Sequence, residues 1–209
     1  MSNNIVLVPL DQTDNILKEF FIKDGGITPS GNFRKSVYLA AKKDFLFLRG
    51  AGFEKDPFNF SKRDAKTLIN NLPSFTAILL YCTVIDLLAR IMKKPKIIPR
   101  NQSRNYFRWS AKRWFELNYS KVDALWNLRN GMVHQYHLGD NRAVPHGFLG
   151  SMRYSKKDKK WEFNLNGMFG DIRKAGKKCY EHIKSKSLPT RRKYASFIYK
   201  YGFFYTPIS

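Results

Sequence analysis

Residues 74–92, SFTAILLYCTVIDLLARIM, are apolar on almost every side of a helical wheel. A helix that is apolar all round belongs in the interior of a fold, so this stretch predicts the central, buried helix of a helical bundle. Its one carboxylate, Asp86, lies among Ile85, Leu87 and Leu88. A charge in such surroundings needs a partner, because burying it alone would cost several kcal/mol.

The partner that the sequence offers is Arg129, in the amphipathic run from Ser120 to Leu138 (SKVDALWNLRNGMVHQYHL). Apolar residues recur there at helical spacing and define one face: Val122, Leu125, Trp126, Met132, Val133 and Tyr136. Arg129 falls in the middle of that face, and a polar stripe beside it holds Asp123, Asn127, Asn130, His134 and His137. An Asp86–Arg129 ion pair would satisfy both charges, either within a site or as a purely structural brace.

Capping and turn residues divide the rest of the chain into further elements. Helices are expected over residues 11–24, 32–49, 61–70 and 103–117, and a last basic helix over residues 167–186. The spacing of Ser120 and Asp123 predicts a capping box at the start of the helix that carries Arg129. Strand-like runs over residues 146–154 and 160–166 flank a lysine-rich turn and predict a β-hairpin.

The expected architecture is therefore mainly α. We expect one helical domain over residues 1–187, with a small hairpin at about residues 146–166, followed by a basic and aromatic tail over residues 188–209. A chain of 209 residues can bury one sizeable core.

Cellular location is bounded by what the sequence lacks. Asp86 and Arg90 interrupt the longest apolar run, so we expect no bilayer-spanning segment. The N-terminus, MSNNIVLVPLDQTDN, does not resemble a signal peptide. Cys82 and Cys179 are expected as free thiols of a reducing compartment, and the cytoplasm is the expected location.

The charge of the chain is strongly positive and uneven. Its 38 basic and 16 acidic residues give a net charge of +22, of which +7 lies in residues 1–100 and +15 in residues 101–209. Such a field attracts polyanions and favours nucleic acid as the partner, with anionic lipid and acidic proteins as alternatives.

Two segments mix basic and aromatic residues in the way that suits single-stranded RNA, in which cations neutralise phosphates and exposed rings stack on bases. The candidate RNA-binding cations are Arg104, Arg108, Lys112 and Arg113 in the first segment, and Arg191, Arg192 and Lys193 in the tail. Structural roles compete with this interpretation. Phe107 and Trp114 are expected in a helix core, the tail fits a packed segment as well as an RNA arm, and the lysine-rich hairpin tip is expected as a solvated turn.

The segment LRNGMVHQY, residues 128–136, resembles the signature of the HEPN superfamily of nucleotide-binding domains. In that family an arginine precedes a histidine by a short spacer, often with a polar residue directly after the arginine. Arg129, Asn130 and His134 match this pattern with a spacer of four residues, and Tyr136 matches the longer form of some HEPN toxins. The resemblance implies a helical bundle, in which Asp86 is the polar residue that an earlier helix often carries.

The resemblance also implies metal-independent cleavage of RNA, which leaves a 2′,3′-cyclic phosphate and a 5′-hydroxyl. His134 would then act as the acid or base, Arg129 would hold the phosphate, and Asn130 would orient the imidazole or bond the phosphate. One chain supplies one such histidine, so a homodimer with a composite cleft is expected. In toxins paired with a nucleotidyltransferase, the tyrosine at the position of Tyr136 is a target of inactivating adenylylation.

The expected setting is toxin–antitoxin function or antiviral abortive infection, with RNA as substrate and an antitoxin or other regulatory protein as a candidate partner. His134 and His137, three residues apart, could ligate one metal ion, but no third ligand with convincing spacing follows, although His146 could in principle join them. Neither a metal nor a cofactor is expected. No Gly-rich phosphate loop or nucleophile motif is present. The rival function is a non-catalytic RNA-binding or scaffold protein, and a membrane-surface protein is a third alternative.

Overall fold

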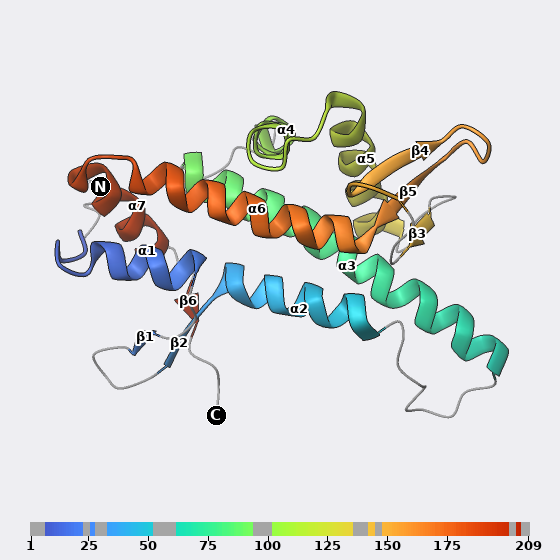
Figure 1. The fold of residues 1–209 in the computed structure, drawn as a ribbon, viewed down its shortest axis with the longest axis horizontal. Helices are drawn as coiled ribbons and strands as arrows, with labels where there is room; N and C mark the ends of the chain where they lie inside the picture. The colour runs from blue at the N-terminus through green and yellow to red at the C-terminus, as the bar shows by residue number, and fades with distance from the viewer. Residues whose placement is uncertain are drawn as a thin grey trace.

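The computed structural model describes residues 7–22, 26–27, 33–51, 62–93, 102–135, 142–144, 148–200 and 204–205. Within these ranges seven helices make up most of the fold (Figure 1): α1 Thr13–Phe21, α2 Val37–Ala51, α3 Lys62–Lys93, α4 Ser103–Arg113, α5 Tyr119–Gln135, α6 Leu165–Lys184 and α7 Leu188–Lys200. The expected mainly α architecture with a β-hairpin is confirmed. None of the described helices combines the length and the hydropathy that crossing a bilayer requires.

Helix α3 is the centre of the bundle and contacts α2, α4, α5, α6 and α7. Figure 1 shows α6 running along it, with α1 and α2 on one side and α4 and α5 on the other. Its fully enclosed side chains are Ala77, Ile78, Tyr81, Cys82, Val84, Ile85, Leu88, Ala89 and Ile91. The central, buried helix expected over residues 74–92 is confirmed.

The separate helix expected over residues 61–70 is wrong, because α3 is continuous over Lys62–Lys93 and passes through Pro73. Proline has a fixed φ that suits a helix, and its missing amide and ring clash cost about 3 kcal/mol without obliging the helix to end. Residues 62–93 contain no glycine, the residue that most often ends a helix.

Six short strands form two small sheets in the described part of the chain. Strands β4 Met152–Ser155 and β5 Lys160–Asn164 pair in antiparallel fashion as the expected hairpin, and β3 Arg142–Val144 pairs with β5 in parallel. The other sheet joins β1 Gly26–Ile27, β2 Phe33–Ser36 and β6 Phe204–Tyr205. The sequence did not predict it, since strands this short carry no readable alternation; α2 accordingly begins at Val37 and not at residue 32.

The C-terminal residues 188–200 form helix α7, which packs on α1 and buries Tyr194, Ala195, Phe197 and Ile198. The N-terminal segment is fastened to the same helix. The Val8 amide donates to Ser196 Oγ at 2.9 Å, and Arg192 Nε donates to the Val8 carbonyl at 2.5 Å. The tail was expected either as a packed segment or as an RNA arm, and residues 188–200 form a packed segment.

Helices α2 and α6 approach each other closely at Gly176. The buried Tyr38 ring packs against Phe20 and Phe21, and its hydroxyl donates to the Ile172 carbonyl at 2.8 Å. A Cβ atom at position 176 would overlap with the ring and hydroxyl of Tyr38. The absence of a side chain at Gly176 is therefore what lets Tyr38 reach its hydrogen-bond acceptor.

A partly buried polar network ties the hairpin to the bundle. The Tyr81 hydroxyl of α3 donates to Asp171 Oδ2 of α6 at 3.1 Å, and the side chain of Ser151, just before β4, also bonds to Asp171. Burial raises the pKa of Asp171, and the hydrogen bonds from Ser151 and Tyr81 oppose that rise. An ionised Asp171 is thus less favourable in the folded chain than in water.

Relative to wild type, Asp171→Asn is expected to have a more favourable change in the free energy of unfolding at pH 7 than at pH 3. The pKa of Asp171 in the folded chain lies above the unfolded value of about 4. The wild type therefore loses stability as the pH rises through the interval between these two pKa values. Below the interval both states hold the proton, and asparagine keeps an acceptor for Tyr81. Urea denaturation of both proteins at the two pH values measures the effect; a pH-independent difference would refute it.

Candidate functional site

Asp86 and Arg129 form the ion pair that the sequence predicted. Arg129 Nη2 of α5 lies 2.9 Å from Asp86 Oδ2 of α3, and the two side chains are 30% and 32% exposed. The pair therefore lies at the edge of the core and not inside it. A charged group that keeps a third of its surface is still accessible to a ligand.

The surroundings of Asp86 disfavour its negative charge. Burial against α3 neighbours raises the pKa of Asp86, and the charge and hydrogen bond of Arg129 oppose that rise. The arginine is therefore what keeps a carboxylate tolerable at this position.

Cys82 lies one turn before Asp86 and is fully enclosed. Burial, with the Asp86 carboxylate nearby, raises the pKa of its thiol far above the ordinary value. A nucleophilic cysteine requires the opposite shift and access to a substrate. Cys82 is thus a core residue.

Two neighbours on α5 complete the fixation of Arg129. Its guanidinium carbon lies 5.1 Å from the centroid of the Trp126 ring, and Nη1 donates to Asn130 Oδ1 at 3.3 Å. Trp126 was expected on the apolar face but not as a contact of Arg129; its place three residues earlier on the helix is the signal that could have indicated it. Within the described part of the chain, Asp86 and Asn130 engage Nη2 and Nη1 of Arg129, and the remaining N–H donors of the guanidinium could bind an anion.

The last turn of α5 includes the position of the motif histidine. His134 belongs to the helix, four residues after Asn130, which places the two positions one above the other on one side. The side chain of His134 lies outside the described part, as do Tyr136, His137 and His146 entirely. At Gly131, between Arg129 and His134, an added Cβ would meet nothing within 4 Å. The space beside Gly131 is therefore open.

The candidate RNA-binding arginines of α4 have a structural partner. Arg108 bonds to Asp123 Oδ1 of α5 through Nε at 3.0 Å and Nη2 at 2.7 Å, and Arg104 Nη2 lies 3.7 Å from the same atom. These contacts join α4 to α5. The capping box expected from Ser120 and Asp123 is wrong. Asn118 Oδ1 instead accepts from the Lys121 amide and the Ser120 hydroxyl, and Asp123 bonds to the arginines of α4.

The other two candidate cations of the first basic segment each contact an aromatic ring and remain exposed to solvent. Lys112 Nζ lies 3.5 Å from the centroid of the Tyr119 ring, and the Arg113 guanidinium lies 5.6 Å from that of Trp114. Phe107 and Trp114 are buried, as expected for core residues. Both basic side chains are exposed at the end of α4.

In the tail, the cations fasten α7. Arg191 Nη1 pairs with Asp14 Oδ2 of α1 at 3.1 Å, and Arg192 is bonded to the Val8 carbonyl. Lys193 is exposed. The structure thus gathers Asp86, Arg129 and Asn130 at one place. Arg104, Arg108 and Arg191 instead join helices, and Arg192 holds the N-terminal segment against α7.

Among the described side chains, no three His, Cys, Asp or Glu residues converge in a group that could hold a metal ion. We found no protein family, no curated protein and no solved structure that matches this chain.

Proposed function

We propose that the chain is an RNA endonuclease of the HEPN type, whose site is built on α5. The observation that carries the proposal is the Asp86–Arg129 pair: a guanidinium fixed from the side by a carboxylate and a tryptophan ring, at the exposed edge of the core. Asn130 and His134 follow on the same helix. This is the composition that a phosphate-binding, proton-transferring site needs.

The chemistry would proceed without a metal. Attack of the 2′-oxygen of RNA on the adjacent phosphorus forms a new P–O bond and breaks the bond to the 5′-oxygen. The 2′-hydroxyl loses a proton and the leaving oxygen gains one; an imidazole with a pKa of about 6.5 can do either near neutral pH. Arg129 would stabilise the charge that develops on the phosphoryl oxygens.

The reaction profits from a base and an acid, and each chain supplies one His134. We therefore propose a homodimer in which two α5 helices face each other across a composite cleft. The net charge of +22 supports RNA as the substrate. The proposed setting is a cytoplasmic toxin or antiviral effector, held in check by an antitoxin or another regulatory protein.

Substitution of His134 by alanine is expected to lower the rate of RNA cleavage at least a hundredfold, the usual contribution of a general acid or base. The melting temperature and the affinity for RNA should not change. His182→Ala is the matched control, because His182 lies on α6, where its ring packs against Trp114. Single-turnover cleavage of a labelled single-stranded RNA gives the rates.

If His134→Ala cuts RNA as fast as wild type, the site is not catalytic. If neither protein cuts RNA and both bind it equally well, the chain is a non-catalytic RNA-binding protein in which Asp86 and Arg129 only brace the core.

A further inference from the structure

The β4–β5 hairpin carries an aromatic pair at the edge of the bundle, in which Trp161 packs partly against the core and Tyr154 is exposed. Tyr154 and Trp161 are directly opposite each other on the two strands, with ring centroids 5.5 Å apart and planes at 64°. One pair nearer the root on the same face, Met152 and Phe163 are buried in the core. Tyr154 is 50% exposed, so the apolar face of the hairpin continues past the protein that could cover it.

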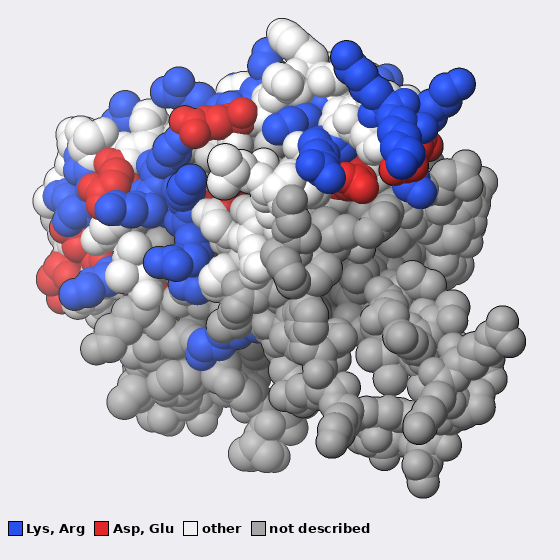
Figure 2. Space-filling model, turned by 45° about the vertical axis from the view of Figure 1, so that its right-hand side comes forward, with Lys and Arg blue, Asp and Glu red and all other residues white. Residues whose placement is uncertain are grey.

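The tip that follows this pair is densely basic. Lys156, Lys157 and Lys159 are exposed, and no carboxylate in the described part of the chain lies within ion-pair distance of any of them. Figure 2 shows Lys and Arg side chains gathered at its upper right, over the end of the molecule that carries the hairpin. Each of these lysines leaves a charge free for an anionic partner.

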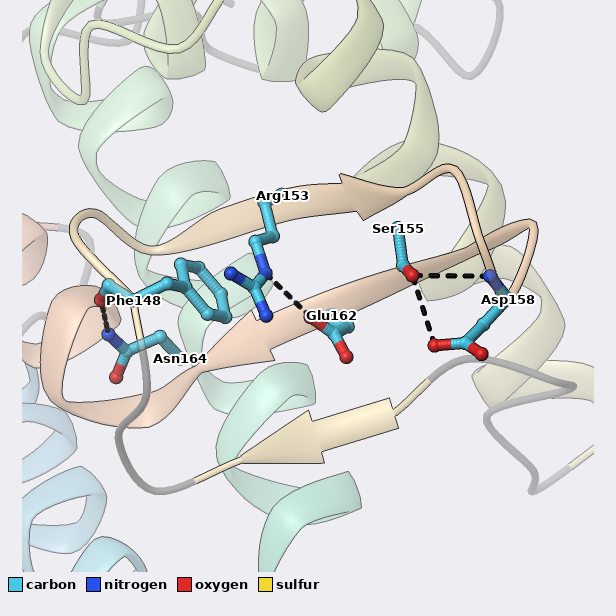
Figure 3. Close-up of polar contacts among 6 residues, drawn as sticks. All are labelled: Phe148, Arg153, Ser155, Asp158, Glu162 and Asn164. Carbon is cyan, nitrogen blue, oxygen red and sulfur yellow. Dashed lines mark hydrogen bonds and ion pairs between the residues drawn. The ribbon is translucent and has the colours of Figure 1, made fainter.

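The turn holds the lysines in a defined conformation. Ser155 Oγ bonds to Asp158 Oδ2 at 3.0 Å and accepts from the Asp158 amide at 3.3 Å (Figure 3). Lys159 has a φ of +51°, in the left-handed region that glycine and asparagine adopt at lower cost. A lysine thus occupies a position at which the turn alone would favour glycine.

The root of the hairpin is equally fixed. Asn164 Nδ2 donates to the Phe148 carbonyl at 2.6 Å, while its Oδ1 caps α6 by accepting from the amides of Asn166 and Gly167. Between root and tip, Arg153 Nε bonds to Glu162 Oε2 at 2.6 Å across the strands. These hydrogen bonds tie the strands that carry the aromatic pair and the lysines to the start of α6.

We propose that the hairpin is a single-stranded RNA-binding element that presents substrate to the α5 site. An exposed tyrosine ring with a T-shaped partner beside it is a platform for one unpaired base, and the lysines suit the adjoining phosphates. This inference rests on RNA being the substrate of the α5 site. Arg153 has no part in it, since Glu162 holds it.

The chain connectivity keeps the two places near each other. Helix α5 ends at Gln135, and β3, which begins at Arg142, pairs Arg142 with Glu162, the neighbour of Trp161. Seven residue steps span at most about 25 Å. A short single strand can therefore contact the last turn of α5 and the hairpin at once.

The test measures binding separately from cleavage, in a His134→Ala background that should leave RNA uncut. Lys156, Lys157 and Lys159 are replaced together by alanine, and Tyr154 is replaced by alanine or by phenylalanine. Fluorescence anisotropy with a labelled, unstructured RNA of about a dozen nucleotides, the length of one or two single-strand sites, gives Kd as a function of salt. A blunt RNA duplex is the second probe.

The triple lysine variant is expected to flatten the slope of log Kd against log salt by about 2, because each phosphate contact to a single strand contributes about 0.7. Tyr154→Ala should weaken binding of the single strand about tenfold and leave the duplex unaffected, since stacking on one base is worth about 1–3 kcal/mol. Tyr154→Phe should bind like the parent, because it keeps the ring.

The matched control removes three exposed lysines elsewhere, Lys18, Lys177 and Lys186. An equal loss of affinity in this control would reduce the effect to overall charge and overturn the proposal. Unchanged affinity of both hairpin variants would also overturn it, whether or not the wild type cuts RNA. If the hairpin variants lost binding to anionic vesicles but kept their binding to RNA, the hairpin would be assigned to a membrane surface. That result would overturn the proposal as well. Cleavage that His134→Ala does not affect would refute the proposed function alone.

Discussion

Replacing Arg129 with methionine is expected to slow RNA cleavage roughly a thousandfold, because a fixed donor to the developing phosphoryl charge typically contributes a factor of this size. The same substitution should also lower the free energy of unfolding by about 1–3 kcal/mol. It leaves Asp86 without its partner, at a site intermediate between a surface and a buried pair. The melting temperature and the single-turnover rate measure the two effects.

A second variant separates the catalytic role of Arg129 from its structural role. Asp86→Leu combined with Arg129→Met removes both charges and keeps apolar bulk between α3 and α5, so stability should return to within about 1 kcal/mol of wild type. Cleavage should not return. Recovery of cleavage together with stability would show that Arg129 serves only as a brace.

Gly176→Ala is expected to lower the free energy of unfolding by about 3 kcal/mol or more, which corresponds to a fall of about 6–12 °C in Tm. The added methyl would overlap with the buried Tyr38 ring and would cost the hydrogen bond from its hydroxyl to the Ile172 carbonyl. Thermal unfolding followed by circular dichroism measures the change.

Helix α6 supplies its own control for this substitution. At Gly170 an added Cβ meets nothing within 4 Å, so Gly170→Ala should stabilise the helix by up to about 1 kcal/mol. Tyr38→Leu should make Gly176→Ala less costly, because it removes the overlapping atoms. If Gly176→Ala and Gly170→Ala had the same Tm, the close approach of α2 and α6 would be refuted.

Several features of the fold could be predicted from the sequence because a local pattern decides them. Residues 74–92 are apolar on almost every side, which only a buried helix tolerates. A single carboxylate in that run and a single arginine on the apolar face of α5 required each other, and they form the pair at 2.9 Å. The hairpin followed from two strand-like runs around a polar turn.

Other features depend on residues far apart in the chain and have no local signal. Arg191 pairs with Asp14, and Arg108 with Asp123, so cations that suggested an RNA surface instead join helices. The basic, aromatic tail gave no indication of which neighbour would cover it. The exposure of Tyr154, next to the lysine-rich turn, could not be predicted either, because the exposure of a ring is fixed only by tertiary packing.

The central claim is that this protein cleaves RNA through the RNA's own 2′-hydroxyl. The most direct test is to incubate the purified protein with a single-stranded RNA in EDTA, beside DNA of the same sequence, and to identify the ends of the products. We expect 2′,3′-cyclic phosphate and 5′-hydroxyl ends from RNA, and intact DNA. Products with 3′-hydroxyl and 5′-phosphate ends, or cleavage that occurs only when a divalent metal is added, would contradict the claim.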